Sequence, residues 1–236
     1  MHRRILLTGA SGGLGLIIAE LLLQEGHFVY LHCHSRPNAL QPLCKKYPSH
    51  TKMIAADLLI DEDLNVLFQS TEDVNVLIHA AGIASAGMSW KVPKEEFEKV
   101  NHINYFAPFY LSQFFIPTMR KNSWGRIIFF SSVVAQKGIP GTSAYAASKS
   151  ALIGLSRTMA SELGAAGITV NTIAPGYMDT GMIREIPEEM RTELLKSIPS
   201  RELGNSKNIA ELVSFILKDN ANYINGQTIS VNGGMV

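Results

Sequence analysis

The stretch ILLTGASGGLG, from Ile5 to Gly15, joins a short apolar run to a glycine-rich turn and then to a helical pattern. Apolar residues at helical spacing follow: Leu14, Ile17, Ile18, Leu21 and Leu22. A strand, a glycine turn and a helix N-terminus together present backbone N–H groups and a positive dipole end, which suits a pyrophosphate. The glycines Gly9, Gly13 and Gly15 depart from the usual dinucleotide fingerprint, so we expect a somewhat different turn. The alternative is a plain glycine-rich connection.

Short apolar runs alternate with helical patterns along the whole chain. The predicted strands are Ile5–Thr8, Phe28–Cys33, Met53–Ala56, Val74–His79, Arg126–Ser131, Ile168–Ile173 and Thr228–Val231. The predicted helices include Glu95–Arg120, Ser143–Leu163 and Ile209–Leu217, the last behind a polar start at Asn205 and Ser206. This alternation predicts an α/β fold, a Rossmann-type doubly wound parallel sheet of about seven strands with helices on both faces. Because no break in composition marks a linker, we expect residues 1–236 to form a single domain.

Composition excludes several classes of partner. The formal net charge is +1, with 21 basic and 20 acidic residues and no long run of either sign, so we expect no nucleic acid and no membrane as partner. Two cysteines, Cys33 and Cys44, cannot form a disulfide framework, and neither a signal peptide nor a long apolar stretch appears. The default expectation is a cytoplasmic protein.

The segment 177–204 is the one irregular zone between two firm elements. It carries Pro187, Pro199 and several charges. Long loops within compact α/β domains are often lids over a binding site, and we predict a lid here. The alternative is an ordinary surface connection.

The second predicted strand ends in HCHSR, where dinucleotide-binding folds that select NAD(H) carry an acidic residue. Cys33 stands at the strand end instead, and Arg36 follows, whose guanidinium would hold a 2′-phosphate. This favours NADP(H); the alternative is that Arg36 is a solvated loop residue. His32 and His34 would share one face of a strand, but no further ligand follows at a usable spacing, which argues against a metal site.

TSAYAASKSALIG, from Thr142 to Gly154, places Tyr145 one helical turn before Lys149. A free phenol has a pKa of about 10, so a nearby cation would help it to work as an acid near neutral pH. Taken alone, the pair is equally well explained as two surface residues of a helix. The segments HAAG, from His79 to Gly82, and FFSS, ending at Ser132, bring small and hydroxyl residues to the carboxyl ends of two strands, where ligands of open α/β folds bind.

Together, TGASGGLG, HAAG, Asn104 in HINYF, Ser132, YAASK and the APG at Ala174–Gly176 resemble the short-chain dehydrogenase/reductase family in order and spacing. The resemblance covers nearly the whole chain and implies one dinucleotide-binding reductase domain. It implies that Tyr145 is the general acid, that Lys149 supplies charge and holds the nicotinamide ribose, that Ser132 polarises the carbonyl, and that Asn104 helps to hold a water. The implied cofactor contacts are Gly9, Ser11, Gly13, Leu14, Gly15, Arg36, Asp57, Leu58, Ala81, Gly82, Tyr145, Lys149, Pro175, Gly176 and Thr180. For Asp57 and Thr180, the capping of a local turn is an alternative.

Within the family, GITVNTIAPGYMDTGM, SIPSRELG and NGQTISVNGGMV resemble the 3-oxoacyl-[acyl-carrier-protein] reductases. This resemblance implies NADPH-dependent reduction of a 3-oxoacyl thioester in fatty-acid or polyketide-like synthesis, and a homo-oligomer, tetramer or dimer, built on the long helices. Two departures concern the acyl carrier protein, because Ser123 and Ala166 stand where members often carry docking arginines.

Three basic residues, Arg120, Lys121 and Arg126, remain near the first of these places. A third departure is His79, which replaces the family's usual asparagine and either serves as donor and acceptor or is tolerated in the core. The competing hypotheses are a reductase or dehydrogenase of a small free alcohol, sugar or steroid, and a dinucleotide-binding protein without catalysis.

Overall fold

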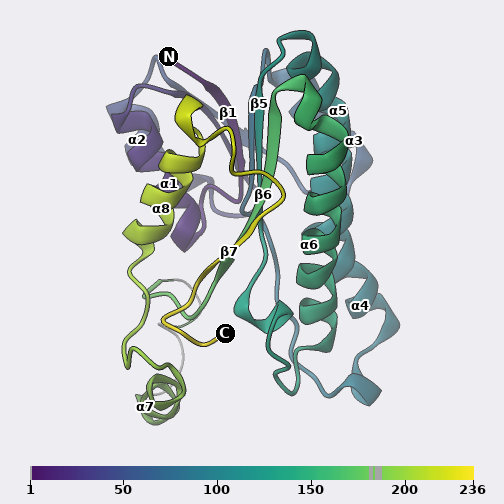
Figure 1. The fold of residues 1–236 in the computed structure, drawn as a ribbon, viewed down its shortest axis with the longest axis vertical. Coiled ribbons are helices and arrows are strands. Elements are labelled where there is room, and N and C mark those ends of the chain that lie inside the picture. Colours follow the sequence, from purple (N-terminus) through teal and green to yellow (C-terminus); the bar gives the residue numbers. More distant parts are fainter. Residues whose placement is uncertain (1, 181–182, 184–187) are drawn as a thin grey trace.

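The computed structural model describes residues 2–180, 183 and 188–236 of the chain, and its centre is one parallel sheet of seven strands (Figure 1). The strands run in the order β3-β2-β1-β4-β5-β6-β7. Their bounds are β1 Arg4–Thr8, β2 Phe28–Cys33, β3 Thr51–Ala55, β4 Val76–His79, β5 Gly125–Phe130, β6 Ile168–Pro175 and β7 Thr228–Val231. The doubly wound parallel sheet is therefore confirmed, with strand ends displaced by up to two residues from the prediction.

Helices cover both faces of the sheet (Figure 1). One face carries α1 (Gly13–Gln24), α2 (Gln41–Lys46) and α8 (Ser206–Ile216), and the other carries α3 (Asp61–Ser70), α4 (Lys94–Asn101), α5 (Ala107–Lys121) and α6 (Ser143–Leu163). A further helix, α7 (Glu188–Ser197), lies at the lower end of the molecule in Figure 1, where β7 leads into the C-terminus.

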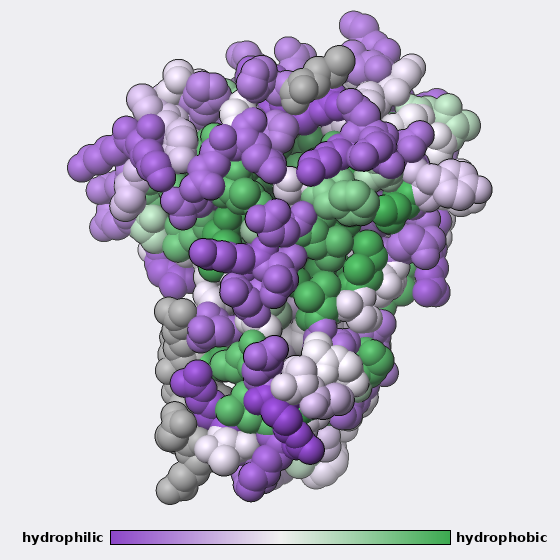
Figure 2. Space-filling view, turned by 60° about the vertical axis from the view of Figure 1, so that its left-hand side comes forward, coloured by the Kyte–Doolittle hydropathy of each residue, from purple (hydrophilic) through white to green (hydrophobic). Residues whose placement is uncertain are grey.

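The strands are apolar throughout because both of their faces are buried. In β1, Ile5 and Leu7 pack with α1 and α8, whereas Leu6 between them packs with α3 and α5. Figure 2 shows the side on which α1, α2 and α8 lie; polar side chains cover most of its upper part, and apolar side chains appear between them lower down.

The order of the strands reverses direction at β1, which pairs with β2 on one side and with β4 on the other. Connections from the neighbouring strands leave toward opposite faces at this point, so the loops after β1 and β4 separate and leave a crevice at the carboxyl edge. Thr8, the last residue of β1, is in register with His79, the last residue of β4. The motifs TGASGGLG and HAAG therefore begin side by side.

The predicted helix over Glu95–Arg120 is wrong in one respect, because it is interrupted. Between α4 and α5 the chain forms a π-helical turn over His102–Phe106. Pro108 follows the turn and has no N–H to offer the carbonyl four residues earlier, that of Asn104, so a regular α-helical ladder cannot continue there. Asn104 thus sits in a widened turn, a position that helical periodicity alone did not indicate.

Other elements agree with the sequence. The helix α6 has the predicted bounds, and α8 begins at the predicted polar start, where the Asn205 side chain accepts the N–H of Lys207 at 2.9 Å. Of the predicted lid over 177–204, residues 181–182 and 184–187 lie outside the described part of the chain. The remainder includes α7 and a bridge between Met178 and Gly204. The lid itself stays a prediction.

Candidate active site

The glycine turn after β1 is formed by close approaches of the backbone that a side chain would block. Gly9 has a φ of 67°, and a Cβ there would lie 2.7 Å from Ala81 on the neighbouring loop. A Cβ on Gly15 would lie 2.2 Å from the carbonyl oxygen of Gly9. Gly12 is the N-cap of α1, so the first N–H groups of that helix, at Gly13 and Leu14, begin directly beside the turn.

A cleft of about 270 Å³ opens between this turn and the loops after β2, β3 and β4. Its lining residues are Gly9, Ser11, Gly12, His32, His34, Ser35, Arg36, Asp57, Leu58, Ala80, Ala81, Gly82, Ile83 and Ile103. Seven of the predicted cofactor contacts lie among them. The others, at the start of α1, after β6 and on α6, do not line this cleft. Backbone N–H groups, a helix N-terminus and small residues at a switch point suit the adenosine and pyrophosphate of a dinucleotide.

Polar side chains stand at the end of the cleft that the loops after β2 and β3 form. His34 is exposed, and its Nε2 lies 3.5 Å from Oδ2 of Asp57, while Oδ1 of Asp57 accepts the N–H of Leu59 at 3.0 Å. Asp57 therefore makes the local turn contact that the alternative interpretation predicts, and it also lines the cleft. His32 is 2 % exposed and lies within β2, whereas His34 lies beyond the strand end, and both line the cleft.

Asn104 ties the π-helical turn to the loop after β4. Its Oδ1 accepts the N–H of Ile83 at 2.9 Å, and its Nδ2 donates to the carbonyl of Ile83 at 2.8 Å and to Oγ of Ser148 at 3.0 Å. A Cβ on Gly82 would lie 3.1 Å from Oδ1 of Asn104 and 3.2 Å from Nζ of Lys149. Asn104 and Lys149 therefore converge on the backbone of Gly82.

Tyr145 and Lys149 lie one turn apart on α6, as predicted; Lys149 is buried, and Tyr145 is partly buried. Nζ of Lys149 donates to the carbonyl of Phe130, the last residue of β5, at 2.7 Å and lies 5.7 Å from the centroid of the Tyr145 ring. Burial lowers the pKa of Lys149 to about 8.

The expected lowering of the Tyr145 pKa by a cation is not found. Burial raises the pKa of Tyr145, and the neighbouring Ser132 hydroxyl opposes this shift in part. The pKa rises because removal from water disfavours the phenolate more than the phenol. Tyr145 therefore stays protonated at neutral pH, as a proton donor must.

His79, in the place of the family's usual asparagine, is buried against α5. Its Nε2 lies 3.0 Å from Oγ of Ser112, which itself donates to the carbonyl of Pro108 at 2.8 Å. Since the one hydroxyl proton of Ser112 is used, Nε2 of His79 must be the donor. Within the described part of the chain, Nδ1 has no partner. Burial, and secondarily the Lys149 charge, lowers the pKa of His79 to about 3.

Three predicted contacts lie farther along the sheet edge. Pro175 ends β6, and the N–H of Gly176 donates to the carbonyl of Val231 at the end of β7 at 2.9 Å. Thr180 donates its N–H to the carbonyl of Met178 at 2.7 Å, which is a local turn. These residues stand at the carboxyl edge but line no part of the cleft described above.

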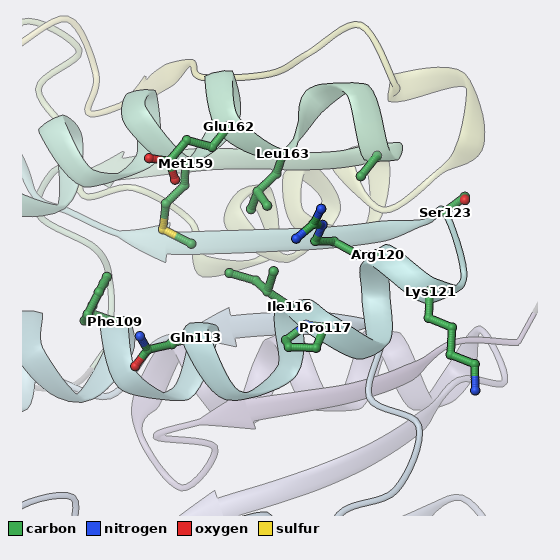
Figure 3. Close-up of a pocket in the computed structure, with 11 residues that line it drawn as sticks. Phe109, Gln113, Ile116, Pro117, Arg120, Lys121, Ser123, Met159, Glu162 and Leu163 are labelled. Atoms are coloured by element: carbon green, nitrogen blue, oxygen red, sulfur yellow. The ribbon is translucent and has the colours of Figure 1, made fainter.

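The expected basic cluster is not formed. Arg126 is 2 % exposed and donates to the carbonyls of Gly125 and Gly167. Arg120 and Lys121 belong to the C-terminal end of α5, next to the amino end of β5 and hence at the sheet edge opposite the cleft. Figure 3 shows Arg120 pointing into a groove between α5 and α6, whereas Lys121 points away from it.

Sequence reasoning missed several lining residues. Gly12 could have been found, because it belongs to the quoted glycine motif. His32 was considered only as a metal ligand, and nothing in the sequence shows that its imidazole lies beneath the turn. Ile83 contributes through its backbone, which has no sequence signature. In the described part of the chain, His, Cys, Asp and Glu side chains nowhere gather in threes suited to a metal ion, and no helix has the length and apolar character needed to cross a membrane.

Comparison with known proteins points in one direction. The family model described as "Enoyl-(Acyl carrier protein) reductase" matches residues 9–236. The 3-oxoacyl-[acyl-carrier-protein] reductase FabG of Rickettsia conorii is 38% identical over 231 residues, covering 98% of this chain and 95% of the relative. The 3-oxoacyl-[acyl-carrier-protein] reductase MabA of Mycobacterium tuberculosis is 35% identical, covering 100% and 93%.

A relative with a different name and a solved structure extend the comparison. Nodulation protein G of a Rhizobium species is 34% identical, covering 99% of this chain and 96% of the relative. A crystal structure assigned to a betaketoacyl-ACP reductase superposes with a TM-score of 0.89 at 27% identity, covering 98% and 97% of the two chains. The cleft, the Tyr145–Lys149 pair and the near-complete match to these relatives agree, and the chain belongs to the short-chain dehydrogenase/reductase family, oxidoreductases that use a nicotinamide dinucleotide.

Proposed function

We propose that the protein reduces a 3-oxoacyl thioester to the 3-hydroxyacyl thioester with NADPH, in fatty-acid or polyketide-like synthesis. The observation that carries the proposal is the pairing of the buried Lys149 with the partly buried Tyr145 at the carboxyl edge of a sheet whose switch-point cleft suits a dinucleotide. The relatives' names supply the substrate class.

The bound NADPH supplies the hydride. Tyr145, kept protonated by its raised pKa, donates its phenolic proton to the carbonyl oxygen, and the Ser132 hydroxyl donates a hydrogen bond to the same oxygen. In this proposal the Lys149 ammonium, 5.7 Å from the ring centroid, offsets only part of the burial cost of the phenolate left after proton transfer, so the Tyr145 pKa stays raised overall. The side chain of Asn104 hydrogen-bonds to the backbone of Ile83 and to Ser148. These contacts fix the segments that surround Lys149.

Arg36 carries the preference for NADPH over NADH in this proposal. It lies in the cleft beside His34 and Ser35, and no carboxylate stands at the end of β2, where one would hydrogen-bond a ribose diol and repel a phosphate. We expect Arg36→Ala to raise the KM for NADPH about tenfold or more while changing that for NADH little. Steady-state kinetics with both cofactors measures this; equal kcat/KM values in the unmodified protein would contradict the preference.

The substrate is tested by NADPH oxidation with acetoacetyl thioesters, both free and bound to an acyl carrier protein. Tyr145→Phe is the control for background oxidation. We expect turnover of a thioester by the unmodified protein. If neither thioester is reduced while a simple ketone or sugar is turned over efficiently, the proposed substrate class is wrong.

The same experiment also tests whether binding to an acyl carrier protein makes the thioester a better substrate. Because Arg126 is buried and Arg120 and Lys121 lie at the opposite sheet edge, a carrier attracted to them would not face this chain's own cleft. Long-range attraction would act on the association rate, so any advantage of the carrier-bound substrate should shrink as ionic strength rises. Charge reversal at Lys121 tests whether this place contributes.

We also propose a homo-oligomer in which a second copy covers α5 and α6. Three aromatic side chains four residues apart, Phe106, Tyr110 and Phe114, are exposed by 42%, 45% and 49%. Tyr110 and Phe114 lie on α5, and Phe106 ends the π-helical turn directly before it; α5 also borders the groove of about 720 Å³ between α5 and α6 (Figure 3). Large exposed apolar surfaces of this kind are typical of interfaces.

Sedimentation or light scattering of the Tyr110→Glu variant tests the interface, with Tyr223→Glu, at a 99% exposed site elsewhere, as the matched control. We expect the first variant alone to shift the protein to a smaller species. A monomeric unmodified protein would rule the interface out.

A further inference from the structure

His32 lies beneath the cleft with both ring nitrogens engaged. The N–H of Gly9 donates to Nδ1 at 3.2 Å, and Nε2 lies 3.1 Å from the carbonyl oxygen of Ala56. An amide N–H can only donate and a carbonyl can only accept, so Nδ1 must carry the lone pair and Nε2 the proton. The two partners together therefore select one neutral tautomer. Burial lowers the pKa of His32 to about 4, so this tautomer persists at neutral pH.

The two partners of His32 belong to opposite walls of the cleft. Gly9 opens the phosphate-binding turn, while Ala56 directly precedes Asp57 and Leu58 at the adenosine end. The strands β1 and β3 do not pair with each other, because β2 lies between them. Past the strand ends, the loops are held to β2 by two backbone bonds, from Ala10 to the His32 carbonyl at 2.8 Å and from Ala56 to the Cys33 carbonyl at 3.0 Å. The imidazole adds a side-chain link that spans from one loop to the other.

We propose that His32 is a positioning residue for dinucleotide binding, whose imidazole holds the turn at Gly9 and the loop at Ala56 at the spacing that the adenosine and pyrophosphate require. The inference rests on the proposed use of NADP(H). His32 contacts neither Tyr145 nor Lys149 in any described hydrogen bond, so its removal weakens binding of the adenosine half and leaves the chemical step unchanged. Leaving the partly buried N–H of Gly9 and the buried carbonyl of Ala56 without partners makes the paired geometry unfavourable, and the two loops relax apart.

The test compares His32→Leu, which removes both contacts, with His32→Gln, whose amide offers an acceptor and a donor. The probes are NADPH and 2′,5′-ADP, a fragment without nicotinamide. We expect His32→Leu to raise the Kd of both probes at least tenfold, about 1.4 kcal/mol. At saturating NADPH, its kcat should stay within about twofold of the unmodified value. His32→Gln should restore most of the affinity for both probes.

The matched control is His79→Leu, which deletes another buried imidazole of the same sheet, outside the cleft. It should leave the Kd of 2′,5′-ADP unchanged even if it destabilises the fold. The inference is overturned if His32→Leu binds 2′,5′-ADP as well as the unmodified protein does, or if His79→Leu weakens binding equally. Should His32→Leu not fold, His32→Asn decides: its shorter amide keeps at most one contact, and undiminished affinity there overturns the inference. An unmodified protein that binds neither probe refutes the use of NADP(H) itself.

Discussion

At the scale of single residues, burial controls the chemistry of the site more than pairwise charge does. Tyr145 and Lys149 shift in opposite directions for the same reason, since the charged form of each is disfavoured away from water. The sequence correctly placed the pair on one helix face. It could not show that Lys149 is buried and Tyr145 partly buried, because this burial comes from segments that are distant in sequence, among them β5 and the loop after β4.

We expect Tyr145→Phe to abolish turnover while leaving NADPH affinity nearly unchanged, because the phenolic proton is lost but the ring volume remains. Steady-state kinetics and equilibrium binding measure the two effects. A variant that retains more than about a tenth of the unmodified kcat, equivalent to a barrier change under about 1.4 kcal/mol, would show that Tyr145 is not the acid.

The pH dependence of ketone reduction should report Lys149. Its lowered pKa, about 8, means that the ammonium is present below this pH and lost above it. Tyr145, with its raised pKa, stays protonated over the same range. We therefore expect log kcat/KM for reduction to be level below pH 8 and to fall as pH rises further. A profile that stays level well above pH 8 contradicts a role for the Lys149 charge.

At the scale of elements, the glycines on helices differ in what surrounds them. A Cβ on Gly15, in α1, would meet the backbone of Gly9 and Ala10, and neither can move without distorting the glycine turn after β1. A Cβ on Gly154, in α6, would meet nothing within 4 Å. The sequence shows both as helical glycines, and only the folded backbone distinguishes the constrained one from the free one.

In the single chain, where no second copy covers α6, we expect Gly154→Ala to stabilise the fold by about 0.5–1 kcal/mol, because alanine loses less conformational entropy in a helix. Gly15→Ala should instead destabilise the fold and weaken NADPH binding together. Denaturant unfolding and cofactor titration of the two variants measure these effects. Equal stability changes in the two variants would mean that the close approach at Gly15 does not constrain the turn.

At the scale of the whole molecule, two buried histidines couple stability to pH. His32 and His79 have pKa values lowered to about 4 and about 3, below the value near 6.5 expected in the unfolded chain. Between these values the unfolded chain binds protons that the folded protein does not. The contribution of these two histidines to the free energy of unfolding should therefore be fully present above pH 6.5. It should fall as the pH falls, by up to about 1.4 kcal/mol per pH unit for each histidine.

Denaturant unfolding between pH 4 and 7 tests this coupling. We expect His79→Asn and His32→Gln each to make the fall in stability with acid less steep, while replacement of the exposed His34 changes it little. If the slopes of the two buried-site variants match that of the unmodified protein, the acid sensitivity arises elsewhere.

The sequence by itself determined the sheet, its two helical layers and the motifs at its carboxyl edge, because hydrophobic periodicity and glycine placement are local properties that a chain carries before it folds. It also placed the Tyr145–Lys149 pair, since four residues make one helical turn. Tertiary structure alone decided that the Asn104 side chain holds the loop after β4, that Arg126 is buried, and that His32 joins two loops across β2. Each of these depends on which distant segments become neighbours, and hydrogen bonds and burial between such segments leave no periodic trace in the sequence.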